Sequence, residues 1–136
     1  MDTVELNSFN PNMMKTDTST VSIPQIVAIE TLNNQQDKCR LHLAGGSDLV
    51  VLHSHQALLE KIGGRASSIT VDVWDVLGRN LPWAMFVEHI TAITGKDNQQ
   101  DESHVALSNG EEYKVLMGYQ DLVSRFKNDG AYSPVR

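Results

Sequence analysis

The sequence predicts an α+β fold made of two tandem β-β-β-α repeat units that share one core about a pseudo-two-fold axis. Three observations favour it: a self-match at an offset of 64 residues, strands that alternate apolar and polar side chains, and a short amphipathic helix closing each match. With 136 residues and 40% hydrophobic residues, the chain suits one domain or two small units with a common core.

The self-match begins with the tetrapeptide NQQD, which occurs at residues 34–37 and again at 98–101. In that register residues 26–63 and 90–127 align without gaps and are identical at thirteen of 38 positions. Unrelated segments of average composition would share roughly two. Self-similarity of this kind is the signature of a repeated structural unit. We expect a flexible N-terminal arm at 1–20, repeat unit 1 at 21–66, repeat unit 2 at 67–127 and a flexible tail at 128–136.

Each copy has the same predicted order of elements. An extended apolar run leads into the NQQD turn, and a second strand follows, with Cys39, Leu41 and Leu43 on one face. Gly46 in the first copy and Asn109-Gly110 in the second predict a tight hairpin, because such turns need positive φ. After the third strand, Ser54 or Gly118 is the expected N-cap of a helix. Each predicted helix has about eight residues, and so short a helix is marginal without tertiary packing.

The second unit carries an extra hairpin between residues 67 and 89, where Ile69, Val71 and Val73 share one strand face. The corresponding part of the first copy is residues 1–20, which is polar and aperiodic and contains Pro11. Those features are typical of a flexible arm.

Charge and cysteine content narrow the classes of function. The formal net charge is -6, so no basic field favours nonspecific binding to nucleic acid or anionic lipid. Cys39 is the one cysteine, which excludes an internal disulfide and fits a reducing compartment. No window approaches the roughly 18 apolar residues of a membrane helix. We expect a cytoplasmic protein without membrane contact.

Four residues of metal-binding type, Cys39, His42, His53 and His55, lie within seventeen residues of the first copy. Their spacing matches no metal motif, and Cys39 and His42 should point to opposite strand faces. No serine or cysteine stands beside a base in a nucleophilic arrangement, and the glycine pairs lack phosphate-loop spacing. We therefore expect no metal, no cofactor and no enzymatic activity.

The candidate partner-binding residues are two glutamine pairs and one tryptophan: Gln35, Gln36, Gln99, Gln100 and Trp74. The glutamines belong to the repeated turns, which Asn34 and Asn98 could close by bonding backbone, or which could meet a symmetric partner. Trp74 shares a strand face with Thr70 and Asp72. It either packs between the units or anchors a partner.

Residues 69–126 resemble the small FlbD/SwrD-type proteins associated with bacterial flagella. The resemblance lies in VLGRNLPWAMFVEHITAIT, a glycine turn followed by a strand, and in HVALSNGEEYKVLMGYQDLV, an Asn-Gly hairpin with a closing helix. It implies a fold and no reaction. The LytTR type of DNA-binding domain is a second comparison. Its basic segment containing His, Arg and Ser is not matched, since LHSHQ is the nearest stretch.

These observations favour a non-enzymatic interaction or regulatory protein, typical of a bacterium or mobile element, that presents a duplicated β-rich module to a protein partner and allows a homodimer. Two alternatives stay open. One is a sequence-specific DNA-binding transcription regulator, although the acidic charge disfavours nucleic acid. The other is a small-molecule sensor with its ligand at the seam between the repeats.

Overall fold

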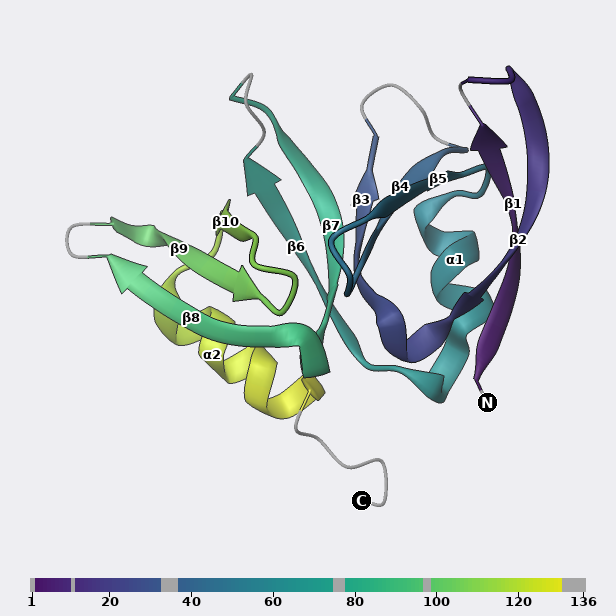
Figure 1. Cartoon of the computed structure of the whole chain (residues 1–136). Helices are drawn as coiled ribbons and strands as arrows, with labels where there is room; N and C mark the ends of the chain where they lie inside the picture. The colour runs from purple at the N-terminus through teal and green to yellow at the C-terminus, as the bar shows by residue number, and fades with distance from the viewer. Residues whose placement is uncertain (1, 11, 33–36, 75–77, 97–98, 131–136) are drawn as a thin grey trace. The chain divides into compact units, whose positions relative to one another are not determined.

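A computed structural model describes residues 2–10, 12–32, 37–74, 78–96 and 99–130. The chain divides into two compact units, Met1–Ala66 and Ser67–Arg136. The strand pairings within each unit are antiparallel. The two units can be followed by colour in Figure 1, from purple to teal for the first and from teal to yellow for the second.

The first unit contains five strands and one α-helix. They are β1 (Thr3–Asn10), β2 (Lys15–Ser22), β3 (Ile26–Thr31), β4 (Cys39–Leu43), β5 (Asp48–Val51) and α1 (His55–Ile62), with single helical turns at Ile23–Gln25 and Gly63–Arg65. Their order in the sheet is β2-β1-β5-β4-β3. The hairpin of β1 and β2 therefore lies beside β5, the last strand of the three-stranded meander, and α1 packs against β3.

The second unit also has five strands followed by a helix. They are β6 (Ser68–Trp74), β7 (Asn80–Phe86), β8 (Ile90–Lys96), β9 (Gln99–Leu107), β10 (Glu112–Val115) and α2 (Tyr119–Arg125), with helical turns at Val87–His89 and Phe126–Gly130. The strand order is β7-β6-β10-β9-β8, and α2 packs against β8 and β9.

The predicted fold class is wrong. The described residues form ten strands of antiparallel sheet with only two short α-helices. The expected tandem β-β-β-α repeat units sharing one core about a pseudo-two-fold axis are not supported, because each unit holds five strands. A three-stranded unit of about forty residues buries too little surface to be stable alone, whereas five strands and a helix give a unit near the size of the smallest independent domains.

The main source of this error is residues 1–20, which form a hairpin instead of a flexible arm. Strands β1 and β2 pair along their whole length, from Thr3 with Ser22 to Asn10 with Lys15. The inward positions of β1 are Val4, Leu6 and Ser8, with exposed fractions of 7%, 1% and 3%. The period of two is present, but a buried serine stands where an apolar residue would have revealed it.

The ends of the chain and the second repeated turn also differ from expectation. Helix α2 continues into a π-helical turn at Phe126–Gly130, which covers the first part of the predicted tail. The remainder, 131–136, lies outside the described residues. In the second NQQD copy, residues 99–101 belong to β9 instead of a turn, and Asn98 lies outside the described residues.

The predicted hairpin turns and helix caps are confirmed. Gly46 and Gly110 both have φ of 90° and each donates its N–H three residues back, to Leu43 and Leu107. The hydroxyl of Ser54 accepts the N–H of Ala57 as an N-cap. Among the described residues, no helix is long and apolar enough to span a membrane.

Adding a β-carbon at the hairpin glycines tests the requirement for positive φ. We expect Gly46→Ala to lower the free energy of unfolding by about 1–2 kcal/mol, because an L-residue is disfavoured in that conformation. Gly45→Ala is the matched control: its backbone is not left-handed, and a β-carbon there would meet nothing within 4 Å. Urea unfolding of both variants measures the difference, and equal losses would contradict the turn assignment.

Candidate functional site

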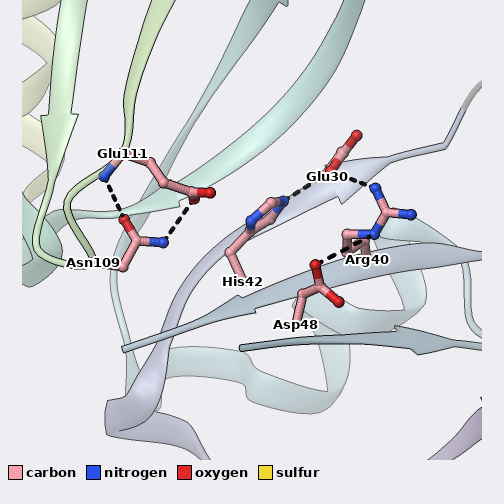
Figure 2. Close-up of polar contacts among 6 residues, drawn as sticks. All are labelled: Glu30, Arg40, His42, Asp48, Asn109 and Glu111. Carbon is pink, nitrogen blue, oxygen red and sulfur yellow. Dashed lines mark hydrogen bonds and ion pairs between the residues drawn. The ribbon is translucent and has the colours of Figure 1, made fainter. Parts of the chain in front are cut away.

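Charged side chains gather on one face of the first unit, where β3, β4 and β5 lie side by side (Figure 2). Glu30 of β3 is paired across the sheet with Arg40 of β4, and His42 of β4 with Asp48 of β5. Arg40 and His42 are two residues apart on one strand and so share a face. The sequence motif CRLHL thus places a guanidinium and an imidazole beside two carboxylates.

The short contact in this cluster joins His42 to Glu30, with 2.8 Å between Nε2 and Oε1. The imidazole is 7% exposed, and a buried polar ring needs such a partner. Arg40 lies 3.4 Å from the same Glu30 oxygen and 3.9 Å from Asp48. These longer pairs are partly exposed and are worth little individually. The cluster therefore orients His42 and balances charge on the sheet.

Cys39 is an unreactive thiol on the opposite face of β4. It is 1% exposed, and burial, with a smaller contribution from the charge of Glu30, raises its pKa from 9.0 to about 11. Thiolates are the nucleophilic and metal-binding form of cysteine. Cys39 therefore stays protonated at neutral pH and serves the core.

Both remaining histidines of this region hold neighbouring segments together. His53 Nε2 accepts a hydrogen bond from the backbone N–H of Asn7 at 3.1 Å, and His55 Nδ1 lies 3.2 Å from the hydroxyl of Thr31. Burial lowers the pKa of both imidazoles, aided at His53 by the charge of Lys61. In the part of the chain that the structure describes, no group of three or more metal-ligating side chains is found.

Trp74, the tryptophan for which packing between the units and anchoring of a partner were both left open, is half-buried at the end of β6. The ammonium group of Lys114 lies 5.5 Å from the centre of its ring. Within the described residues, the buried indole Nε1 has no hydrogen-bond partner, which costs free energy. Trp83, by contrast, is 5% exposed and packs against Tyr113 with 4.4 Å between ring centres and the ring planes tilted by 52°.

Of the four candidate glutamines, the structure describes the side chain of Gln100 alone. Gln35 and Gln36 lie outside the described residues, and of Gln99 the structure defines the backbone alone. Gln100 is exposed on β9. Their role in binding a partner stays a prediction.

Two arginine side chains form hydrogen bonds with backbone carbonyl groups and so stabilise the fold. Arg65 donates to the carbonyl groups of Lys61, Ile62 and Thr3, and Arg125 donates to that of Thr70. The exposed cations with neither an ion pair nor a side-chain hydrogen bond among the described residues are Lys15, Lys61 and Lys127. Both units are acidic, with five basic and seven acidic residues in 1–66 and six and ten in 67–136.

Sequence reasoning missed the roles of Glu30, Arg40 and Asp48, although the alternation in CRLHL could have placed Arg40 beside a neighbouring carboxylate. It also missed Ser8 and Asp17, because both fall in the segment assigned to a flexible arm. The only available signal there was the spacing of Val4, Leu6 and Ser8.

Comparisons with known proteins give a fold and no family. No family model matches the chain, and no curated protein matches it. Among solved structures, the LytTr DNA-binding domain of a methyl-accepting/DNA response regulator from Bacillus cereus matches with a TM-score of 0.59 and 14% sequence identity. The match covers 90% of this chain and 95% of that domain.

This likeness overturns the family resemblance expected from the sequence. The resemblance of residues 69–126 to FlbD/SwrD-type proteins is wrong, and the LytTR comparison that had been set aside identifies the fold. The missing basic segment misled the sequence comparison. A fold depends on strand pattern and pairing, which can persist at 14% identity without any particular surface residue.

The raised pKa of Cys39 makes stability depend on alkaline pH. The unfolded thiol ionises from about pH 9, whereas the folded thiol keeps its proton to about pH 11, so stability falls as pH rises through this window. Between about pH 8 and about pH 10.5, we expect the wild type to lose about 2 kcal/mol more than Cys39→Val. Urea unfolding at both pH values measures it, and an equal loss in the two proteins would contradict the assignment.

The unpartnered indole of Trp74 predicts an unusual response to substitution. We expect Trp74→Phe to leave the free energy of unfolding unchanged or to raise it by up to about 1 kcal/mol, because it removes an unsatisfied N–H. Trp83→Phe is the control and should lower the free energy of unfolding by about 1–2 kcal/mol, because it removes packing in the core and part of the contact with Tyr113. Equal destabilisation of the two variants in thermal unfolding would count against this account of Trp74.

Proposed function

We propose that this protein is a non-enzymatic, sequence-specific DNA-binding module of a transcription regulator, acting in the cytoplasm. The observation that supports the proposal is the fold likeness to a LytTr DNA-binding domain, which extends over 90% of the chain. Because of this likeness, we favour DNA binding over the binding of a protein partner, which the sequence alone favoured. The likeness concerns the fold, so the chemistry of contact has to be argued from this chain's own residues.

The distribution of charge sets the kind of contact expected. Arg65 and Arg125 bond backbone carbonyls, and Arg40 and Lys114 face carboxylates. With so few cations left for phosphates, counterion release would be modest. Recognition would then depend on neutral polar groups at base edges more than on phosphate contacts.

A second candidate function, binding of a protein partner, is favoured by the tip of the β1–β2 hairpin. Met13 and Met14 are 61% and 76% exposed, and Met14 has a positive φ of 52°. The side chain of Asn10 accepts the N–H groups of Asn12 and Met13 and so fixes the turn. Exposed methionines are common at adaptable protein-binding surfaces. A homodimer through this tip would belong to the same class of function.

Selection from random-sequence duplexes, followed by fluorescence anisotropy on the enriched site, tests DNA binding. We expect one enriched sequence, bound at least about a thousandfold more tightly than scrambled duplex. The slope of log K against log salt should be no steeper than about -3 for three available lysines. Failure to enrich any sequence would refute the proposal. Capture of a stoichiometric protein by wild type, lost in Met13→Ser/Met14→Ser, would favour the second candidate.

Replacing the three exposed lysines that have no ion pair among the described residues distinguishes an effect on phosphate contact from an effect on stability. We expect Lys15→Gln/Lys61→Gln/Lys127→Gln to reduce the salt slope, by about one unit for each lysine that contacts phosphate, and to leave stability unchanged. The control is Arg65→Gln, which removes bonds to Thr3, Lys61 and Ile62 and should lower stability. An unaltered salt slope in the triple variant would exclude these lysines from the interface.

A further inference from the structure

The hairpin of the first unit separates from β5 and leaves a groove. Strands β1 and β5 are paired at one position, Ser8 with Val51, although β1 runs on to Asn10 and β5 begins at Asp48. The groove has a volume of about 370 Å³ and is lined by both strands and by β2. That volume lies at the lower end of the range of small-molecule sites.

The floor of this groove is the buried hydroxyl group of Ser8, bonded to the half-buried hydroxyl group of Ser19. Ser8 is 3% exposed, and its Oγ lies 2.8 Å from Oγ of Ser19 and 3.4 Å from the carbonyl oxygen of Asp17. A buried hydroxyl is costly unless it is bonded. Here the Ser8 hydroxyl is bonded to the Ser19 hydroxyl and to a backbone carbonyl, which gives the groove a hydrogen-bonded polar floor.

In the second unit, the space that corresponds to this groove is filled by side chains. Its strand pair β6–β10 also meets at one position, Val73 with Val115, so Val73 takes the place of Ser8. Two residues before Ser8 in β1, Leu6 pairs with Ser19 of β2. Two residues before Val73 in β6, Val71 pairs with Trp83 of β7.

Ser19 therefore stands where the second unit has Trp83, a buried indole packed against Tyr113 of β10. The groove of the first unit is open at the place where an aromatic ring closes the second.

Carboxylate and hydroxyl groups set the polarity of the groove. Asp17 is half-buried and, among the described residues, has no ion-pair partner. Asp48 is exposed at the rim, 3.9 Å from Arg40. The Lys38 ammonium group lies over the ring of Phe9, at 5.0 Å. The acidic lining favours a ligand that donates hydrogen bonds and carries positive charge.

We propose that this groove binds a small planar ring bearing a cationic hydrogen-bond donor, such as an aryl amidine or a protonated aminoheterocycle. The ring occupies the space that Trp83 fills in the second unit, and the donor group faces Asp17 and the serine pair. This ligand site lies within the first unit and goes beyond the proposed DNA contact, so it can be tested without DNA.

Three probes of one shape test the proposal: benzamidine, neutral benzamide and anionic benzoate, each titrated into the full chain and followed by amide chemical shifts. We expect benzamidine to shift the resonances of β1, β2 and β5 with a dissociation constant of roughly 1–10 mM, as suits so small a ligand. Benzamide should bind about tenfold more weakly, and benzoate should not bind. Equal shifts from all three probes, or none from benzamidine, would overturn the proposal.

Two variants and a control locate the site. Ser19→Trp places in the groove the residue that the second unit uses and should abolish benzamidine binding. Asp17→Asn should weaken it about tenfold, and this variant serves even if Ser19→Trp fails to fold, as a dispersed spectrum would show. Asp72→Asn makes the same charge change at an exposed position outside the groove and should bind as the wild type. Unchanged binding to Asp17→Asn would refute the assigned site.

Discussion

The five-stranded sheet of each unit depends on a short junction between its first hairpin and the three strands that follow. In the first unit the junction is the pair Ser8–Val51, and in the second it is Val73–Val115. His53 extends the first junction by accepting a backbone N–H of β1, which only the neutral imidazole can do. The lowered pKa of His53 agrees with that role. Since few backbone bonds join hairpin to meander, side chains have to complete the connection.

The arginine at the end of each helix supplies part of that connection. Arg65 follows α1 and donates to the carbonyl of Thr3 on β1, and Arg125 ends α2 and donates to the carbonyl of Thr70 on β6. Each guanidinium thus ties the last element of a unit to its first strand. A hydrogen bond from a charged donor is stronger than one between neutral groups, although both of these bonds are exposed to solvent. The same use of arginine reduces the positive charge available to an anionic partner.

Sequence patterns predicted the parts of the fold that local chemistry decides. The positive φ of Gly46 and the cap at Ser54 follow from backbone sterics and unsatisfied N–H groups, which act over a few residues. The hairpin of β1 and β2 could not be predicted in this way, because Ser8 interrupts the apolar alternation and is buried only through its bond to Ser19. The charged cluster around Glu30 depends equally on strand register, which is fixed by pairing between distant segments.

Two inward positions of the first hairpin, one on each of its strands, account for much of the difference between the two units. With Val73 and Trp83, the second junction is closed by apolar contact and by the packing of two aromatic rings, which favours stability. With Ser8 and Ser19, the first junction keeps a polar floor and an open groove. A hydroxyl pair buries less apolar area than an indole and stabilises the sheet less. The first unit therefore lacks apolar packing that the same strand arrangement provides in the second unit, and a hydrogen-bonded polar floor is suited to a binding groove.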